Sequence, residues 1–529
     1  MGAGRRGSVG PAALLLVLVA LSLLAVARAA AGGGGVDGGG GGGAGGEDGE
    51  RLLRLWTDGG GEAGDQEDDV FMWDEEEDDD EAEEGHIMVW GKGRTERPAT
   101  CRNVVNVDTF GAAGDGDADD TEAFCNAWKA ACSLDNAVFL VPAGRRYKVG
   151  AITFMGPCKN KMIIQIQGTI VAPEEPSEWD PRSPRLWLLF SRLAGARIQG
   201  GGVIDGSGSK WWANSCKINK SNPCKPAPTA VTIDSSRGVR VKGLRVQNAQ
   251  QMHLTVYRSR NVRLAGVRIE APEDSPNTDG IHVAESTAVT IQNCRIGTGD
   301  DCISIVNASF NIRMKNIDCG PGHGISCDDL LMHGHGGGGS IGSLGKDGTF
   351  AAVENVALDT ARISRAQNGV RIKTWQGGAG YVRNVRFSNV AVDDVDHPIV
   401  IDQFYCDARG PCRNSTSGVQ VANVLYHNIS GTSRRAEAIR FACSDAAPCT
   451  DIVLRDINLR RSDGDGGGEV QTVCNCAIGF DNGRVSPAAD CLRSSTCGGA
   501  PDHRPDDDDD GKGKPVAGTM PAPILHTEL

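Results

Sequence analysis

The chain has 529 residues, of which 40% are hydrophobic, with 72 glycines, 18 cysteines and a formal net charge of −14. The cysteine count is too high for a typical cytosolic enzyme, and we expect no nucleic-acid partner. The charge is unevenly spread. Residues 47–84 hold 19 acidic and 2 basic residues, a net of −17, so the remainder of the chain carries +3.

Residues 1–29 have the pattern of a secretory signal peptide. Arg5 and Arg6 form the positive start, residues 12–26 are apolar, and residues 27–29 form a small-x-small cleavage site. The apolar run of about fifteen residues is short for a membrane span of roughly 20, and no second run of that length follows. We therefore expect an exported, soluble protein, with a single uncleaved anchor as the alternative.

Two segments lack hydrophobic periodicity. Residues 30–100 combine a glycine-rich run with the acidic run, and residues 498–529 contain five consecutive aspartates. Such segments cannot bury enough apolar surface to fold, so both are predicted to be disordered. The folded domain is therefore expected to be residues 101–497.

One helical pattern is clear in the folded domain, over residues 120–132. Asp120 or Thr121 can cap this helix, and Phe124 and Trp128 lie on its apolar face. We expect a short helix at the amino end of the domain.

Short β-branched runs then recur along the chain. The first four begin 23, 27 and 23 residues apart, and two later ones begin 29 apart; the runs start at Val239, Val262, Val289, Ile312, Val356, Val385, Val424 and Ile452. Repeats of this length indicate stacked coils. A TIM barrel would require a helix after each strand, and a β-sandwich does not explain the period. An all-β parallel β-helix is the expected fold.

Polar motifs interrupt these runs at the same period. Asp279, Asp301 and His323 follow one another at 22-residue steps, and Asp300 is adjacent to Asp301. Equivalent positions of successive coils lie about 4.8 Å apart. The sequence therefore predicts one column of three carboxylates and a histidine.

Such a column can hydrolyse a glycosidic bond. One carboxyl group protonates the leaving oxygen and another activates water, with inversion at a separation of about 6.5–9.5 Å and retention near 5 Å. His323 can support the protonation pattern, and Arg371 and Lys373 alternate on one strand where they can bind an anion. Each motif taken alone has an ordinary alternative: a turn-forming Asp279, a calcium ligand pair at residues 300–301, or a loop histidine.

Five segments resemble those of plant polygalacturonases, glycoside hydrolase family 28. They are SPNTDGIHV (275–283), GTGDDCISI (297–305), CGPGHGIS (319–326), RIKTWQGG (371–378) and the upstream FGAAGDGDADDTEAFCNAW (110–128). The resemblance implies a right-handed single-stranded parallel β-helix with a short N-terminal capping helix. It also implies inverting hydrolysis of α-1,4-galacturonosyl bonds in pectin (homogalacturonan) by a secreted, monomeric cell-wall enzyme that needs no cofactor or metal.

The resemblance also implies roles for individual residues. Asp300 corresponds to the general acid, Asp279 and Asp301 to the residues that activate water, and His323 to the supporting histidine. Substrate-binding residues are Arg371, Lys373, Asn277 and Tyr405, and Cys302 and Cys319 match a family disulfide.

Other cysteines are closely spaced and suggest local disulfides rather than a zinc site: Cys125/Cys132, Cys216/Cys224, Cys406/Cys412, Cys443/Cys449 and Cys491/Cys497. Sequons mark candidate glycosylation sites at Asn219, Asn307, Asn414 and Asn428.

One segment departs from the family pattern. Residues 327–340 separate two motifs that are nearly contiguous in the family, and we expect a glycine-rich surface loop there. A metal site is the alternative, with candidate ligands Asp328, Asp329, His333 and His335. Two rival functions stay open: a calcium-dependent pectate lyase and a catalytically silent wall-binding protein. The acidic segment 47–84 is expected to be a spacer or propeptide, or else a pectin mimic that occupies the Arg371/Lys373 site.

Overall fold

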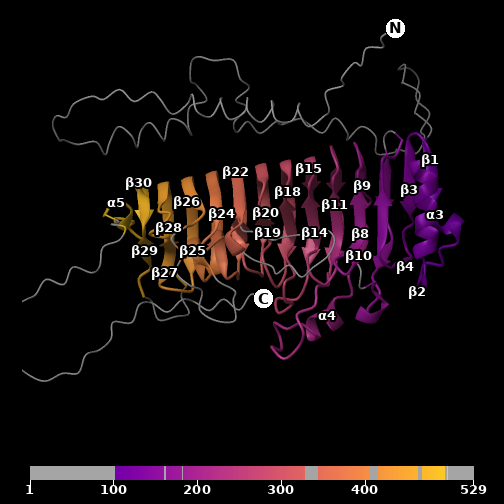
Figure 1. Cartoon of the computed structure of the whole chain (residues 1–529), viewed down its shortest axis with the longest axis horizontal. Coiled ribbons are helices and arrows are strands. Elements are labelled where there is room, and N and C mark those ends of the chain that lie inside the picture. The colour runs from indigo at the N-terminus through magenta and orange to yellow at the C-terminus, as the bar shows by residue number, and fades with distance from the viewer. Residues whose placement is uncertain are drawn as a thin grey trace, which may run out of the picture. The chain divides into compact units, whose positions relative to one another are not determined.

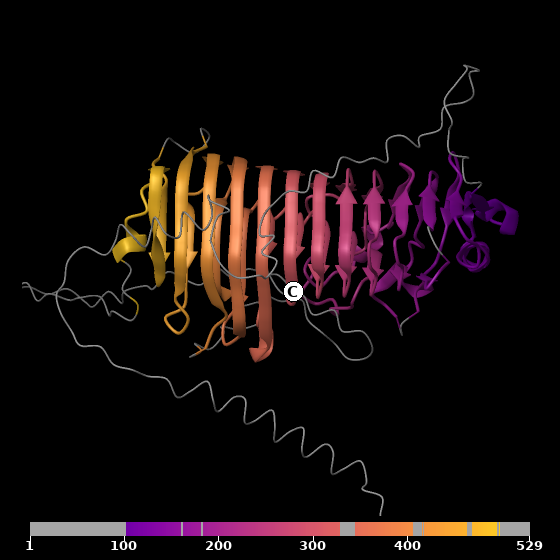
Figure 2. The same ribbon diagram turned by 90° about the horizontal axis from the view of Figure 1, so that it is seen from above.

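The computed structural model describes residues 102–159, 162–180, 183–327, 344–405, 415, 417–462, 468–494 and 497. They wind into a right-handed parallel β-helix, as predicted, in which each coil adds a strand beside that of the coil before (Figure 1). Figure 2 shows the same strands from above, side by side in chain order from indigo to yellow. The predicted disordered segments 30–100 and 498–529, and the predicted signal peptide, lie outside the described residues.

Two parallel sheets form the coils. The eleven-stranded sheet contains, in spatial order, β5 (Ile152–Met155), β8 (Leu186–Ser191), β11 (Thr229–Asp234), β14 (Leu254–Tyr257), β17 (Ile281–Ala284), β19 (Ile303–Ile305), β21 (Ile325–Cys327), β23 (Asn368–Trp375), β25 (His397–Tyr405), β27 (Glu437–Ala442) and β29 (Gln471–Asn475).

The nineteen-stranded sheet contains β1 (Asn103–Asn106), β2 (Asp115–Asp119), β3 (Ala137–Val141), β4 (Arg146–Lys148), β6 (Ile163–Ile166), β7 (Thr169–Val171), β9 (Arg197–Gln199), β10 (Val203–Asp205), β12 (Arg240–Lys242), β13 (Arg245–Gln247), β15 (Arg260–Ala265), β16 (Arg268–Glu270), β18 (Thr287–Gly297), β20 (Ser309–Cys319), β22 (Phe350–Ser364), β24 (Ala379–Val395), β26 (Gln420–Ser433), β28 (Cys449–Arg461) and β30 (Ala477–Ser486). Helical segments are α3 (Thr121–Cys132), α4 (Ser209–Ala213), α5 (Cys491–Ser494), and the 3-10 turns η2 (Val107–Phe110), η3 (Pro176–Glu178) and η4 (Lys346–Gly348).

The repeat predicted from the sequence corresponds to the stacking of successive coils. The β-branched run starts pair with one another in register from Val262 to Ile452, through Val289, Ile312, Val356, Val385 and Val424. Their side chains are buried and form part of one continuous core. Strands such as β18 and β20 alternate inward apolar and outward polar residues, so one face of these strands is buried and the other is free to carry polar groups.

Asparagines occupy the bends within the long strands of the nineteen-stranded sheet. Residues such as Asn293, Asn316, Asn355 and Asn384 adopt a left-handed conformation with φ of 55–59°, which asparagine tolerates better than most residues. Their side-chain amides bond from coil to coil, as in Asn316 to Asn293 at 2.8 Å and Asn384 to Asn355 at 3.1 Å. These ladders keep successive coils in register at the bends.

Helix α3 covers the amino end of the helix core, and Phe124 and Trp128 are buried as predicted. The predicted capping was wrong. Asp120 occupies the N-cap position, but its carboxylate accepts the backbone N–H groups of Ala113 and Gly114 at 2.6 and 3.2 Å. The side chain therefore ties the preceding loop to the helix start instead of capping the helix.

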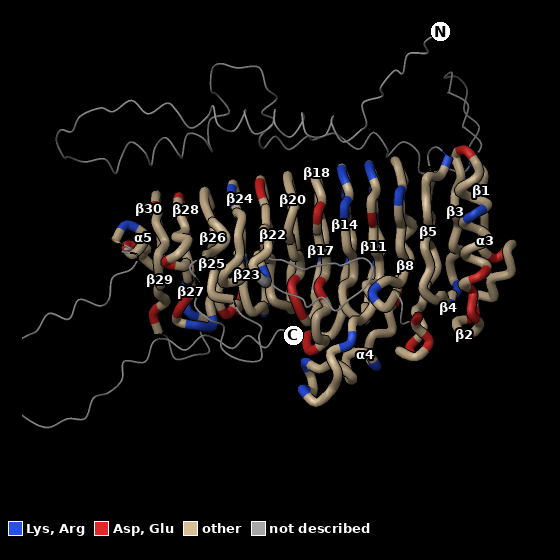
Figure 3. Tube along the Cα trace, viewed as in Figure 1, with Lys and Arg blue, Asp and Glu red and all other residues tan. Residues whose placement is uncertain are grey.

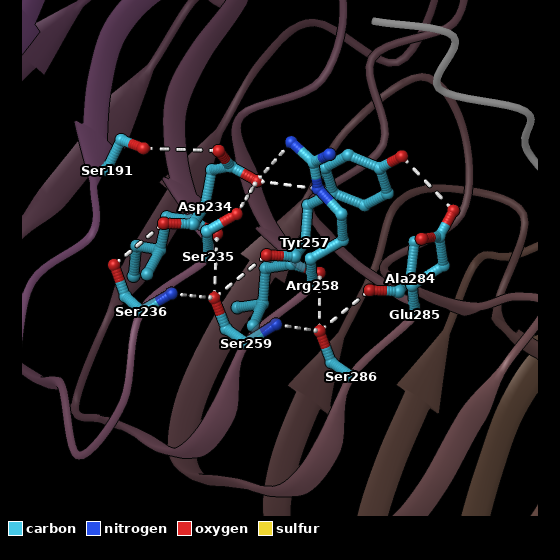
Figure 4. A network of polar contacts seen from close by, with 12 residues as sticks. Ser191, Asp234, Ser235, Ser236, Tyr257, Arg258, Ser259, Ala284, Glu285 and Ser286 are labelled. Atoms are coloured by element: carbon cyan, nitrogen blue, oxygen red, sulfur yellow. Dashed lines mark hydrogen bonds and ion pairs between the residues drawn. The ribbon is translucent and has the colours of Figure 1, made fainter. Parts of the chain in front are cut away.

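Buried serines brace the corners that follow β11, β14 and β17 (Figure 4). The hydroxyl oxygen of Ser259 accepts the backbone N–H of Ser236 at 3.0 Å, and that of Ser286 accepts the N–H of Ser259 at 3.1 Å. Beside them, Arg258 donates to Asp234 at 2.8 Å. Each corner is thus fixed to the corner of the next coil.

Five disulfides join described residues: Cys132–Cys158, Cys216–Cys224, Cys302–Cys319, Cys443–Cys449 and Cys474–Cys491. The predicted pairs Cys216/Cys224, Cys302/Cys319 and Cys443/Cys449 are confirmed, whereas Cys125/Cys132 and Cys491/Cys497 were wrong. Cys125 and Cys132 lie on one helix, where seven residues rise by about 10 Å, beyond the roughly 7 Å reach of a disulfide. Cys406 and Cys412 lie outside the described residues.

The candidate glycosylation sites differ in exposure. Asn219 and Asn428 are exposed, Asn307 is half-buried, and Asn414 lies outside the described residues. Asn428 donates to Asn389 at 2.8 Å within a ladder. Glycosylation stays a prediction at all four. No helix in the described part of the chain combines the length and apolarity that crossing a membrane requires.

Candidate active site

The predicted column of acidic residues and histidine is present. Asp279, Asp301 and His323 each stand two residues before a strand of the eleven-stranded sheet, and the inward residues Ile281, Ile303 and Ile325 of these strands pair in register. One coil separates each member from the next, as the 22-residue step predicted. The three carboxylates are buried or nearly so, while the side chain of His323 is 27% exposed.

Asp300 is held from two directions. Its Oδ1 accepts the backbone N–H of Asp301 at 2.9 Å and contacts Nδ1 of His323 at 3.0 Å. Its carbonyl oxygen also accepts the backbone N–H of His323 at 2.8 Å. Carboxyl and imidazole of neighbouring coils can therefore share a proton without moving the backbone.

Asp301 is held by charge. One guanidinium nitrogen of Arg371 lies 3.2 Å from each of its oxygens, and Arg371 is only 3% exposed. The hydroxyl of Ser326 donates to Oδ2 at 2.7 Å. Charge-assisted contacts of this kind keep a buried carboxylate ionised and fix its orientation.

Asp279 is held through a hydroxyl and an imidazole. The hydroxyl of Ser304 donates to Oδ2 at 2.9 Å, and Nδ1 of His282 lies 2.8 Å from the same hydroxyl oxygen. Because the hydroxyl proton goes to the carboxylate, Nδ1 of His282 must carry a proton and donate to Ser304. Ser304 and His282 are buried, so this chain runs beneath the carboxylate and not through solvent.

His253 supports Asp279 from the preceding coil. Its backbone N–H and its Nδ1 both lie 2.9 Å from the carbonyl oxygen of Asp279. Burial lowers the pKa of His253 to about 4, so the ring is neutral at physiological pH. The carbonyl therefore receives its hydrogen bond without an added positive charge.

Cations and aromatic rings alternate beside this column. Nζ of Lys373 lies 4.5 Å from the ring centre of Tyr405, which meets the ring of Trp375 edge to face at 5.8 Å. Nζ of Lys346 lies 4.9 Å from the ring centre of Trp375. Cation–π contacts of this kind position a lysine without neutralising it, so it still attracts an anion.

Asn277 lies in the turn that leads to Asp279. It is half-buried, has a φ of 55°, and its side chain forms no hydrogen bond with the described residues. The hydroxyl oxygen of the next residue, Thr278, lies 2.7 Å from that of Ser275. It also accepts the backbone N–H of Gly299 at 3.0 Å. Asn277 thus stands on a rigid turn beside the acidic column.

Glycines allow the polar turns to stack. A Cβ on Gly299 would meet the carbonyl oxygen of Ser275 at 1.9 Å, and one on Gly324 would meet that of Asn368 at 2.1 Å. Gly324 also has a φ of 99°, which favours glycine. A side chain at Gly299 would push apart the coils that carry Asp279 and Asp301, and one at Gly324 would push the coil of His323 away from that of Arg371.

Among the described residues, Asp300, Asp301 and His323 form a group that could hold a metal ion, because their ligand atoms lie within 4.8 Å of one another. Arg371 already contacts both oxygens of Asp301, and its positive charge would repel a cation at this point. The geometry favours proton transfer over metal binding. The other candidate ligands, Asp328, Asp329, His333 and His335, lie outside the described residues.

Sequence reasoning missed the hydroxyl donors to the carboxylates of Asp279 and Asp301. Ser304 and Ser326 looked like ordinary strand residues, yet each lies 25 residues after the aspartate that it contacts. This offset is one 22-residue coil plus three residues, so the repeat itself could have found them. Lys346 was missed because no motif marks it, and Trp375 was missed because the RIKTWQGG motif was read only for its two cations.

The chain is similar in sequence and in fold to known proteins. The family described as "Glycosyl hydrolases family 28" matches residues 132–478. The chain is 46% identical to polygalacturonase QRT2 of Arabidopsis thaliana, over 68% of this chain and 79% of that protein. It is 44% identical to polygalacturonase-2 of Solanum lycopersicum, over 74% and 82%. An exopolygalacturonase structure from Thermotoga maritima shares the fold with a TM-score of 0.56 at 21% identity, covering 68% of this chain and 87% of that one.

Proposed function

Because the chain belongs to glycosyl hydrolases family 28, we propose that it hydrolyses the α-1,4-galacturonosyl bonds of pectin, with homogalacturonan as its substrate. The observation that carries the proposal is the column of Asp279, Asp301 and His323, with Asp300 alongside, on successive coils. It places several acid/base groups next to buried cations, as the hydrolysis of an anionic polysaccharide requires.

Asp300 acts as the general acid in this proposal. It donates a proton to the glycosidic oxygen as the bond to the leaving sugar breaks. The 3.0 Å contact with His323 supports this role, because the imidazole can hold the carboxyl proton in place between turnovers.

Asp279 and Asp301 activate the attacking water from the opposite face of the sugar, which inverts the anomeric centre. Both carboxylates are fixed by hydroxyl donors from the next coil, Ser304 and Ser326. Fixed acceptors of this kind orient a water molecule before the reaction and lower the reorganisation that the transition state requires.

Arg371 and Lys373 bind the substrate carboxylate, and Asn277 and Tyr405 line the adjacent sugar positions. Tyr405 supports Lys373 through the 4.5 Å ring contact. A neutral sugar in place of galacturonate would offer Arg371 and Lys373 no carboxylate to bind, which accounts for selectivity toward the acidic polymer.

The decisive experiment compares Asp300→Asn with the parent enzyme on polygalacturonic acid, with release of reducing ends as the measurement. Removal of a general acid costs about 10²–10⁴-fold in rate. Asp318→Asn is the matched control, because Asp318 lies on β20 of the nineteen-stranded sheet and pairs with Arg295 there. Equal activity of Asp300→Asn and the parent would refute the acid assignment, and a lack of activity in both would favour a silent binding protein.

Two further measurements separate the hydrolase from a lyase. Products of a lyase carry a new double bond that absorbs ultraviolet light, and chelation would stop a calcium-dependent reaction. We expect neither effect. We also expect product in the inverted configuration by proton NMR in the first minutes of reaction.

The proposal extends to where the protein acts. Five disulfides among the described residues suit an oxidising compartment, so we propose export through residues 1–29 to the cell wall and action there as a monomer. Amino-terminal sequencing of the secreted protein tests the cleavage after residue 29, and light scattering tests the monomer.

A further inference from the structure

A second cationic surface lies on the nineteen-stranded sheet, on residues that the proposed active site does not use. Figure 3 shows basic segments gathered on the coils near β11 and β14. We define the basic surface by the outward cations of two successive coils: Arg237, Arg240, Lys242, Arg245, Arg260, Arg263 and Arg268.

The pairing of the strands sets these cations in rows. The first row follows the register of β9, β12 and β15 and consists of Arg197, Arg240 and Arg263. Arg245, Arg268 and Arg295 form a second row across β13, β16 and β18. Successive members of a row are one coil apart, about 4.8 Å, so each row is a ladder of guanidinium groups along the axis of the helix.

Acidic residues are scarce on these two coils. Residues 237–247 contain four basic and no acidic residues, and residues 260–270 contain three basic residues and Glu270. Glu270 lies 3.7 Å from Arg245. Arg237, Lys242, Arg260 and Arg268 are exposed and form no ion pair with the described residues. Like charges held this close repel one another, so the arrangement is costly to the fold unless an anion binds there.

The basic surface has a definite end. Further along the same sheet, Asp318 follows Arg295 in the second row and lies 3.5 Å from it. Asp359 likewise follows Lys315 on the next coil. Acidic residues therefore alternate with basic ones beyond β18, whereas the two coils before β18 carry an almost unbroken positive charge.

The backbone beneath the surface is rigid. Ser236 and Ser259, which bond from corner to corner, directly precede Arg237 and Arg260 (Figure 4). Val239, Val241, Val262 and Leu264 fill the core between the outward cations. The spacing of the charges is thus set by the β-helix and does not depend on a mobile loop.

We propose that the basic surface is an accessory binding site for homogalacturonan, which holds a second stretch of the polymer without cleaving it. The ligand class follows from the chemistry: a linear chain with one carboxylate per sugar can place successive charges along a ladder of guanidinium groups. The proposal takes the identity of the polymer from the proposed function and adds a site to it. Its effect is to raise the concentration of long substrate near the enzyme.

The binding test uses full-length Asp300→Asn protein, so that the polymer stays intact, and co-sedimentation with insoluble polygalacturonic acid. The test variant neutralises the four exposed cations without ion pairs: Arg237→Gln, Lys242→Gln, Arg260→Gln and Arg268→Gln. The matched control removes the same charge from exposed positions elsewhere: Lys129→Gln, Arg146→Gln, Arg460→Gln and Arg484→Gln. We expect the test variant to bind about tenfold more weakly, with a shallower dependence on salt, and the control to bind as the parent.

Two outcomes would overturn the proposal. If the control variant loses as much affinity as the test variant, net charge and not this surface governs binding. If highly methyl-esterified pectin binds as tightly as polygalacturonic acid, the surface does not recognise carboxylates. Circular dichroism and thermal unfolding of both variants check that neither has lost its fold.

A kinetic test separates this proposal from the proposed function. In the active enzyme, we expect the four substitutions to raise KM for long polygalacturonic acid and to leave kcat/KM for trigalacturonate unchanged. Equal loss on both substrates would count against an accessory site. Loss of the hydrolysis itself in the parent would refute the function but not the binding measured with Asp300→Asn.

Discussion

The two carboxylates proposed to activate water are held by different means. Asp301 contacts the guanidinium of Arg371 through both oxygens and accepts from Ser326. Asp279 accepts from Ser304, which in turn accepts from His282, and its carbonyl is held by the neutral His253. Thus the described contacts of Asp301 include a guanidinium, which we call the charged setting, whereas those of Asp279 come from a hydroxyl and histidine rings, which we call the neutral setting. Equal spacing in the sequence does not make their chemistry equal.

The difference suggests a division of labour. A guanidinium in contact with a carboxylate competes with a proton for its oxygens, so Arg371 makes Asp301 the poorer proton acceptor while the pair is intact. A hydroxyl donor competes less. We therefore expect Asp279 to take the proton from water and Asp301 to orient the water, and the predictions below test the two settings separately.

The largest effect is expected at the charged setting, from Arg371→Gln. Removing one partner of a buried ion pair leaves an uncompensated charge, which costs about 3–5 kcal/mol of unfolding free energy. Because Arg371 is proposed to bind the substrate carboxylate, the loss of its positive charge should also lower kcat/KM by about 10²–10³-fold. Urea unfolding and initial rates on polygalacturonic acid measure the two effects.

Arg371→Lys is the control for this prediction. It keeps the positive charge but not the planar guanidinium, so most of the stability should return while activity stays low. An Arg371→Gln protein as stable as the parent would show that the Arg371 contact does not hold Asp301. The contrast between the settings of Asp301 and Asp279 would then no longer hold.

The next effect concerns the neutral setting and depends on pH. His253 has a pKa of about 4 in the folded protein because it is buried, against 6.5 as its ordinary value. Between these values the unfolded chain binds the extra proton and the folded one does not. Stability is therefore full above pH 6.5 and falls as the pH drops toward 4, by up to about 3 kcal/mol.

His253→Asn tests this assignment. The variant loses hydrogen bonds at every pH, but the part of the pH-dependent fall that His253 causes should disappear. Urea unfolding at pH 7.5, 5.5 and 4.0 gives the free energy of unfolding of both proteins. In the difference between parent and variant, the contributions of the other titrating groups cancel. An identical fall in parent and variant would mean that His253 is not the group responsible.

The fold and the column were predictable because both depend on the period. Each 22- to 29-residue step in the sequence is one coil, so strand starts such as Val289 and Ile312, and site residues such as Asp279 and Asp301, could be stacked without coordinates. A periodic fold converts distance in sequence into position in space.

The same rule explains the errors. Cys125 and Cys132 were paired because they are near in sequence, but Cys132 bonds to Cys158, which lies 26 residues later and so about one coil away. The capping expected of Asp120 failed for another reason: a loop with unpaired N–H groups packs against the carboxylate. Contacts at single turns depend on local geometry that the period does not determine.

The smallest effect is expected from the hydroxyls, where the two settings can be compared directly. Ser304→Ala removes the link between Asp279 and His282, whereas Ser326→Ala leaves the two Arg371 contacts to hold Asp301. A hydrogen bond to a charged group contributes about 1.5–3 kcal/mol, so kcat/KM should fall about tenfold or more in Ser304→Ala and less in Ser326→Ala.

If His282 acts through Ser304, then His282→Asn should add little to Ser304→Ala in the double variant. Independent, additive losses would place His282 outside the chain, and equal losses in the two serine variants would mean that the charged and neutral settings do not differ in function.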